Sequence, residues 1–280
     1  MPDLSGYEPV VGPSVIEELR QLAKRLARRS ILMVNSTRTG GGVAEILNWM
    51  IPLLGELELD TRWEVIEGSG EFYTVTKKFH NALHGKAEAI TQEMFDRFVE
   101  VGRRNAERMS LKADIVFIHD PQPIVLVERR KAQRSAKWLW RCHIDVSRPQ
   151  KAVWDFLKPY ILQFDASIYS SPAFTQQMAT RQVLVAPSID PLSHKNRDLA
   201  PEEIQAVLRK LEIPADLPII TQVSRFDDLK DPLGVIDAFR RVRKSIPCRL
   251  VLAGGPAGDD PEADEVLNRV REKANGNPGI

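Results

Sequence analysis

A short apolar run, Ser30-Ile31-Leu32-Met33-Val34, is followed by Asn35-Ser36-Thr37-Arg38-Thr39-Gly40-Gly41-Gly42 and then by Val43-Ala44-Glu45-Ile46-Leu47-Asn48-Trp49-Met50. The first run has the composition of a buried strand, and the third has that of a helix, which Pro52 is expected to kink or end. A strand that enters a helix through a glycine loop is the first half of a βαβ unit. This stretch therefore predicts an α/β fold with a mainly parallel sheet.

The same alternation continues along the chain. Further strands are predicted at 61–66, 114–118, 138–142, 166–169, 183–186, 218–223 and 248–253. Helices are predicted over 71–84, 91–110, 201–211 and 262–274, with another beginning at Pro232, a favourable position for proline.

Two prolines interrupt this rhythm in Pro187-Ser188-Ile189-Asp190-Pro191-Leu192-Ser193, which is typical of a connection between domains. We therefore expect one domain over 1–189 and a second over 190–280. The second has only two predicted strands, too few for a stable sheet, and 275–280 resembles a loop about to enter another strand. The sequence thus predicts a second domain that is incomplete in this chain, as in a fragment or one half of a split gene product.

Composition narrows the functional class. The 280 residues carry 39 basic and 38 acidic side chains, a net charge of +1, which argues against a nucleic-acid partner. The sequence shows neither a signal peptide nor an apolar run of membrane-spanning length, so we expect a cytoplasmic protein without a membrane partner. Cys142 and Cys248 lie in or beside apolar runs and are expected to be buried free thiols. A homodimer is one possible assembly, and the sequence does not determine the oligomeric state.

The glycine run is the first candidate site. Gly40, Gly41 and Gly42 let the backbone approach a ligand, and the following helix directs its amino terminus at an anion. A phosphate site is expected here, and the alternative is a flexible loop. The pattern is not the dinucleotide G-x-G-x-x-G motif.

The second candidate is His119-Asp120-Pro121-Gln122-Pro123, a stiff polar run at the end of a predicted strand. His119 could bond a sugar hydroxyl, and Asp120 could orient it. The alternative is that the two residues only cap a turn.

The third candidate is Trp138-Leu139-Trp140-Arg141-Cys142-His143-Ile144-Asp145. Arg141, His143 and Asp145 alternate, so a strand would place all three on one face, where ionisable groups need a reason to be buried. They are suited to sugar hydroxyls or phosphate, and a structural ion-pair network is the alternative.

The fourth candidate follows the predicted strand 218–223. In Ser224-Arg225-Phe226-Asp227-Asp228-Leu229-Lys230, the guanidinium of Arg225 and the ammonium of Lys230 suit a diphosphate at the carboxyl edge of a sheet. The alternative is a solvated loop whose cations pair with Asp227, Asp228 and Asp231. His80 and His84 share one helix face but lack the other ligands of a metal site, and no metal is expected.

These motifs, in this order, resemble the retaining glycosyltransferases that include the sucrose synthases. The closest match is to trehalose synthases and the related trehalose phosphorylases. The matching runs are 34–46, 62–68, 79–83, 118–123, 140–145, 187–192 and 222–227.

The resemblance implies a GT-B fold of two Rossmann-like domains. It implies that His119 and Asp120 are catalytic, and that Arg225, Lys230 and the three glycines bind the donor phosphates. It further implies that sugar is bound by Asn35, Gln122, Arg141, His143 and Asp145.

The implied activity joins glucose from UDP- or ADP-glucose to free glucose, giving trehalose without a cofactor or metal. A phosphorylase using glucose 1-phosphate is the alternative, and a non-catalytic sugar- or phosphate-binding fragment is another. Two features depart from the family: Asp231 stands where many relatives have glycine, and the glutamates that hold the donor would lie beyond residue 280. We therefore expect the chain alone to be inactive.

Overall fold

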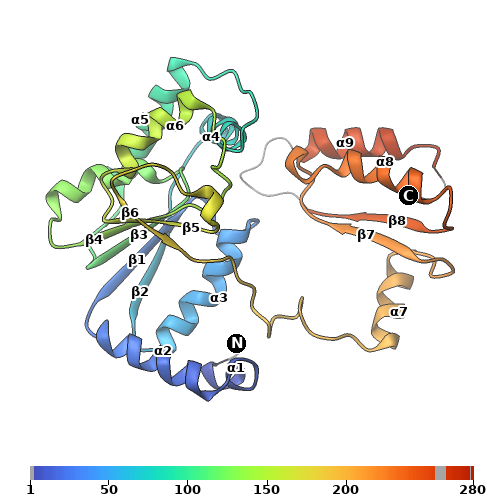
Figure 1. Cartoon of the computed structure of the whole chain (residues 1–280), viewed down its shortest axis with the longest axis horizontal. Coiled ribbons are helices and arrows are strands. Elements are labelled where there is room, and N and C mark those ends of the chain that lie inside the picture. The colour runs from blue at the N-terminus through green and yellow to red at the C-terminus, as the bar shows by residue number, and fades with distance from the viewer. Residues whose placement is uncertain (1–2, 256–262, 278) are drawn as a thin grey trace. The chain divides into compact units, whose positions relative to one another are not determined.

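The computed structural model describes residues 3–255, 263–277 and 279–280. It divides into two compact units, Met1–Ser193 and His194–Ile280 (Figure 1). Each unit contains its own parallel sheet. Within the described ranges, no helix is both long and apolar enough to cross a membrane.

The first unit contains a six-stranded parallel sheet in the order β2-β1-β3-β4-β5-β6. Its strands are β1 (Ser30–Asn35), β2 (Asp60–Val65), β3 (Ile115–His119), β4 (Lys137–Arg141), β5 (Ala166–Tyr169) and β6 (Arg181–Leu184). All six strands predicted for this region are therefore confirmed. The chain runs from β1 outward to β2 and then returns to the other side of β1 at β3. The carboxyl ends of β1 and β3 thus flank the switch point where open α/β sheets bind ligands.

Helices cover both faces of this sheet (Figure 1). On one side lie α4 (Gly70–Leu83), α5 (Gln92–Arg108), α6 (Lys151–Ile161) and the 3₁₀ segment η1 (Ile124–Ala132), packed over a large apolar cluster. On the other side lie α2 (Pro13–Arg25) and α3 (Gly42–Glu56), preceded by α1 (Leu4–Val11). A short 3₁₀ turn, η2 (Pro172–Phe174), follows β5.

Two features of these helices differ from the sequence analysis. The helix α3 continues through Pro52 to Glu56, so of the two alternatives expected for Pro52, ending the helix is wrong and a kink stays a prediction. Leu47 and the side chains around it pack on the sheet, and this packing offsets the hydrogen bond that proline removes. The helices α1, α2 and α6 are not predicted from the sequence.

The second unit contains β7 (Ile219–Val223) and β8 (Arg249–Ala253), paired in parallel, with α7 (Pro201–Lys210), α8 (Pro232–Val242) and α9 (Ala263–Ala274). Both strands agree with the prediction. Phe239 and Leu250 anchor its apolar cluster. The amide of Leu250, on the edge of β8 away from β7, donates to the carbonyl of Gly279 at 2.7 Å. The residues after α9 therefore return to the sheet edge, as the loop-like sequence of 275–280 indicates.

The backbone at Asp231, where the resemblance implies a glycine in many relatives, shows how aspartate is accommodated. Asp231 has φ 48° and ψ 51°, the left-handed region that glycine enters freely and aspartate tolerates. Its carboxylate accepts the amide of Gly234 at 2.9 Å and caps α8. A Cβ on Gly234 would lie 2.1 Å from that carboxylate, so the cap and the glycine depend on each other.

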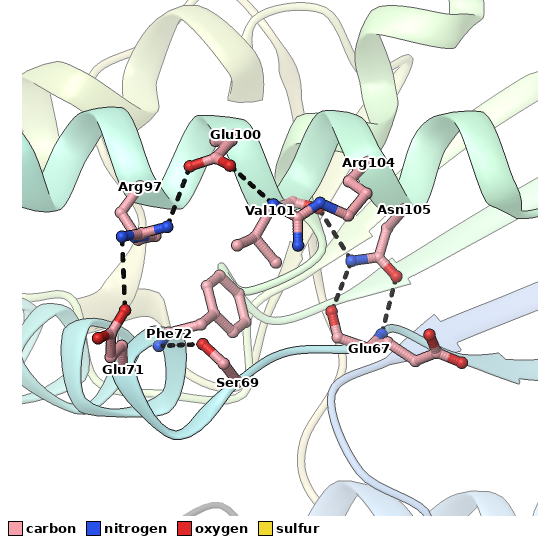
Figure 2. Close-up of polar contacts among 9 residues, drawn as sticks. All are labelled: Glu67, Ser69, Glu71, Phe72, Arg97, Glu100, Val101, Arg104 and Asn105. Atoms are coloured by element: carbon pink, nitrogen blue, oxygen red, sulfur yellow. Dashed lines mark hydrogen bonds and ion pairs between the residues drawn. The ribbon is translucent and has the colours of Figure 1, made fainter.

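A buried amide anchors the loop at the carboxyl end of β2 (Figure 2). The Oδ1 of Asn105 accepts the backbone N–H of Glu67 at 2.8 Å, and its Nδ2 donates to the carbonyls of Glu67 and Val101. Asn105 is 2% exposed. One side chain of α5 therefore satisfies both backbone groups of a residue 38 positions away.

Asn105→Ala should lower the free energy of unfolding of the first unit by about 2–3 kcal/mol, because it leaves buried backbone groups without partners. All five tryptophans lie in this unit, so tryptophan fluorescence during urea unfolding reports on it alone. Glu100→Ala is the matched control on α5, since it removes only exposed ion pairs with Arg97 and Arg104 and should cost under about 0.5 kcal/mol. Equal losses in the two variants would contradict the role given to Asn105.

Candidate functional site

Four predicted site residues come together at the carboxyl ends of adjacent strands. His119 ends β3 and Arg141 ends β4, and the two are paired in the sheet. Asn35 ends β1, the neighbour of β3, and Asp120 directly follows His119. The site therefore lies at the switch point of the first unit.

Asp120 forms the turn that shapes this edge. Its φ of 63° lies in the left-handed region, which aspartate adopts more readily than most residues. Its amide donates to the carbonyl of Arg141 at 2.8 Å, and its own carbonyl accepts the indole N–H of Trp140 at 2.9 Å. Its carboxylate accepts the backbone amide of His143 at 2.7 Å. Asp120 thus positions the loop that carries His143 against the end of β3, which carries His119.

His119 and His143 form a hydrogen-bonded pair. The Nδ1 of His119 lies 2.9 Å from the Nε2 of His143, so one nitrogen donates and the other accepts. His119 is 3% exposed, and its ring also stacks on Phe117. Burial, with the nearby His143 and Arg141, lowers the pKa of His119 to about 3. Burial, together with the positive charge of Arg141, lowers the pKa of His143 to about 4. Both rings are therefore neutral near pH 7.

Two buried polar atoms on this edge lack partners among the described residues: the Nε2 of His119 and the Oε1 of Gln122. Buried polar atoms in proteins are nearly always hydrogen-bonded, so these two are available to water or to a ligand. A neutral imidazole and an amide suit the hydroxyl groups of an uncharged ligand better than an anion.

Arg141 is tied to the sheet itself. Its guanidinium donates to the carbonyl of Tyr169 at 3.3 Å, to the Oγ of Ser170 at 3.3 Å and to the carbonyl of Val185 at 2.6 Å. It therefore links β4 to the ends of β5 and β6, and burial lowers its pKa.

The expectation that Arg141, His143 and Asp145 share one face of a strand is wrong. The strand β4 ends at Arg141, because the turn at Asp120 redirects the following residues, and His143 and Asp145 lie in the next loop. Asp145 there accepts the amide of Ser147 at 2.7 Å. The role of all three in sugar binding stays a prediction.

Contacts among Asn35, Trp63 and Arg38 hold the glycine-bearing loop. No role for Trp63 or Arg38 is predicted from the sequence. The indole of Trp63 donates to the Oδ1 of Asn35 at 2.8 Å, and the Nδ2 of Asn35 donates to the carbonyl of Thr37 at 2.7 Å. Arg38 bonds the carbonyl of Trp63 and stacks on its ring at 4.2 Å. No sequence signal indicates this stack, because the partners come from β2 and from the loop after β1.

The three glycines of that loop differ in whether a larger residue could replace them. Gly40 has φ 84°, which strongly favours glycine. A Cβ on Gly42 would meet nothing within 4 Å, and one on Gly41 would only touch Thr37 at 4.0 Å. The chain's own packing does not require these last two glycines, and the space beside their backbone is open to a ligand. Gly41 caps α3 without a side-chain hydrogen bond.

In the second unit, Arg225 and Lys230 both lie in the loop after β7. The Nη2 of Arg225 lies 3.4 Å from the Oδ2 of Asp227, and Asp227 as a whole is 1% exposed. Asp227 also accepts the amide of Leu229 at 2.8 Å and begins the 3₁₀ turn η3 (Asp228–Lys230). Lys230 is exposed, and its backbone carbonyl accepts a hydrogen bond from the side-chain amide of Gln222. The two cations thus share one loop, and Arg225 is oriented by a buried carboxylate.

Other predicted features are also placed. Cys142 and Cys248 are buried free thiols, as expected. The rings of His80 and His84 lie 4.6 Å apart on α4. No cluster of three or more potential metal ligands occurs within 3–255, 263–277 and 279–280.

The histidine pair predicts a pH dependence of stability. The unfolded chain takes up protons on these rings near pH 6.5, whereas the folded pKa values are about 3 and about 4. Lowering the pH from 7 to 5 should therefore destabilise the first unit, by up to about 1.4 kcal/mol per pH unit for each histidine below pH 6.5.

His143→Asn should make this loss shallower when tryptophan fluorescence follows urea unfolding at each pH. His194→Asn, in the exposed connection, is the control and should leave the loss unchanged. Parallel curves for the unsubstituted chain and His143→Asn would contradict the assignment.

Comparison with known proteins places this geometry in a family. The family description "Trehalose synthase, N-terminal domain" matches residues 33–176. The trehalose synthase of Thermococcus litoralis is 42% identical over 278 residues, which cover 96% of this chain and 67% of that protein. The trehalose phosphorylase of Pleurotus pulmonarius is 27% identical over 99% of this chain and 44% of its own length.

Solved structures show the same fold. A trehalose-6-phosphate synthase superimposes with a TM-score of 0.66 at 14% identity, covering 88% of this chain and 69% of that one. The Escherichia coli protein described as bound with UDP-2-fluoro glucose gives 0.64 at 14% identity, over the same shares of the two chains. The fold is of the GT-B type, as the resemblance implies. On the identity to trehalose synthases over nearly its whole length, the chain belongs to the trehalose synthase family.

Proposed function

We propose that the protein to which this chain contributes is a retaining glucosyltransferase. It joins glucose from UDP- or ADP-glucose to free glucose and forms trehalose. The observation that carries the proposal is the 42% identity to a trehalose synthase, over an alignment that takes in 96% of this chain. The neutral, buried His119 edge supports it, because its unpaired atoms suit sugar hydroxyl groups.

The reaction breaks the bond between the anomeric carbon of the donor glucose and the diphosphate oxygen. A hydroxyl of the acceptor glucose forms the new bond on the same face, and its proton passes to the leaving phosphate. In this mechanism the protein contributes by holding both sugars and the diphosphate in place. The proposal requires no metal and no covalent protein intermediate.

The first unit holds the sugars in this proposal. His119 bonds a hydroxyl of the transferred glucose, and Gln122 bonds a sugar hydroxyl through its unpaired oxygen. His143 supports His119 through the 2.9 Å contact, and Asp120 fixes the relative position of the two rings. Arg141 acts by holding the ends of β4, β5 and β6 together beside the sugar.

Each unit contributes its own groups for phosphate in this proposal. In the second unit, Arg225 and Lys230 supply positive charge. In the first unit, the amides at Gly41 and Gly42 lie at the amino terminus of α3, which suits an anion. Because Asp227 already orients Arg225, the guanidinium loses less freedom when phosphate binds.

A trehalose phosphorylase is the second candidate, supported by the 27% identity over 99% of the chain. It would use glucose 1-phosphate as the donor. The two activities therefore differ in whether a nucleotide is needed.

The activity can be tested in a fusion. The chain spans about two thirds of the trehalose synthases it matches, so the remaining carboxyl-terminal third of the Thermococcus litoralis protein is joined after Ile280. With UDP- or ADP-glucose and glucose, the fusion should form trehalose, and the chain by itself should form little. Trehalose formed only from glucose 1-phosphate would identify the phosphorylase.

His119→Ala in the fusion should lower kcat more than it weakens donor binding, because a contact made in the transition state appears in turnover. A folded fusion that binds nucleotide-glucose but forms no trehalose from any of these donors would refute the proposed function.

Arg225→Ala should weaken binding of nucleotide-glucose to the fusion at least tenfold. A charge-assisted hydrogen bond contributes about 1.5–3 kcal/mol, and tenfold corresponds to about 1.4 kcal/mol. Calorimetric titration measures this. Arg209→Ala, an exposed arginine on α7, is the control and should bind as before. Unchanged affinity in Arg225→Ala would reject this residue as the phosphate contact.

A further inference from the structure

The helix α2 has two apolar faces, and only one is packed. Ala23 belongs to the cluster under the sheet, and Ile16 is 1% exposed. On another face, the side chains of Val15, Leu19 and Leu22 are 39%, 38% and 45% exposed. Leu26, the residue that caps the helix, continues this exposed face. None of these residues belongs to the candidate functional site.

The spacing of the exposed residues is that of a helix-pairing seam. Val15, Leu19, Leu22 and Leu26 are separated by four, three and four positions, which is the a/d pattern of a heptad. Leu19 and Leu26 take the a positions, and Val15 and Leu22 take the d positions. Such a stripe packs against a similar stripe by inserting each side chain between those of the facing helix.

The stripe is complementary to itself in the antiparallel direction. About a two-fold axis, Leu19 of one copy faces Leu22 of the other, and Val15 faces Leu26. Every a position therefore meets a d position, and each contact occurs twice. A two-fold dimer requires this kind of self-complementary surface.

Charge selects the same direction. Glu18 and Arg25 both occupy g positions, on the same side of the stripe, and both are exposed. Antiparallel pairing places Glu18 of each copy beside Arg25 of the other, whereas in-register parallel pairing would place Glu18 beside Ala23 of the other and form no charge pair. Opposite charges beside an apolar seam determine the orientation of helix pairs.

We propose that α2 is a homodimerisation surface that pairs antiparallel with α2 of a second copy of this chain. The apolar stripe supplies the contact, and the Glu18–Arg25 pairs set its direction. The proposal does not depend on glucosyl transfer.

Analytical ultracentrifugation of the chain over a range of concentrations tests the contact. The chain should be in concentration-dependent equilibrium with a dimer, and Leu22→Glu should remain monomeric throughout. Val207→Glu is the matched control, because Val207 is 49% exposed on α7 and the same substitution there should leave the dimer intact. Circular dichroism verifies that both variants are folded. A chain that stays monomeric, or a control that dissociates as Leu22→Glu does, would overturn the proposal.

Charge reversal tests the orientation. Glu18→Arg and Arg25→Glu should each weaken the dimer about tenfold, because each replaces two weak attractions by two repulsions. An equimolar mixture of the two variants should associate again, since every g-position pair then joins opposite charges. Glu18→Arg combined with Arg25→Glu in one chain should dimerise as the unsubstituted chain does. Failure of both rescues would exclude the antiparallel pairing.

The basic residues Arg20 and Lys24 would also suit an anionic membrane surface. The same variants distinguish membrane binding from dimerisation. Binding to phosphatidylserine vesicles would rise in Glu18→Arg and fall in Arg25→Glu, whereas dimerisation falls in both. Opposite effects of the two single variants, with vesicle binding by a monomeric chain, would replace the proposed dimer by a membrane contact.

Discussion

The candidate site depends on the turn at Asp120. This residue continues the pairing of β3 and β4 past the end of β3, through its amide and the carbonyl of Arg141. Its carbonyl and carboxylate then hold Trp140 and the backbone of His143. As a result, the Nδ1 of His119, at the end of β3, lies 2.9 Å from the Nε2 of His143, in the loop after β4. Without this turn, nothing in the local sequence around His143 would bring it to His119.

Burial divides the chemistry between the two units. In the first unit, burial keeps His119 and His143 neutral. The buried guanidinium of Arg141 donates to the backbone carbonyls of Tyr169 and Val185. This edge therefore offers hydrogen bonds without net charge. In the second unit, two basic side chains, Arg225 and Lys230, lie in the loop after β7. The first surface suits uncharged hydroxyl groups, and the second suits anions.

The helix α2 shows how one element can serve the core and a surface. Ala23 and Ile16 secure it to the first unit, and this packing holds the neighbouring stripe of Leu19 and Leu22 in place at the surface. A rigid apolar stripe loses little entropy on association, which makes a short helix a usable contact. The polar loops at the carboxyl ends of the strands stay available for ligands.

The sequence by itself determined the α/β class, the eight strands and the edge on which polar residues gather. Apolar runs and the turn residues between them are local signals that survive in any context. Only the tertiary structure decided which polar atoms meet. Asn35 is held by Trp63, 28 positions away, and Glu67 by Asn105, 38 positions away. The end of β4 at Arg141, which placed His143 and Asp145 in a loop, was decided by Asp120 in the turn after the neighbouring strand β3. Such contacts depend on strand register and helix packing, which no local periodicity encodes.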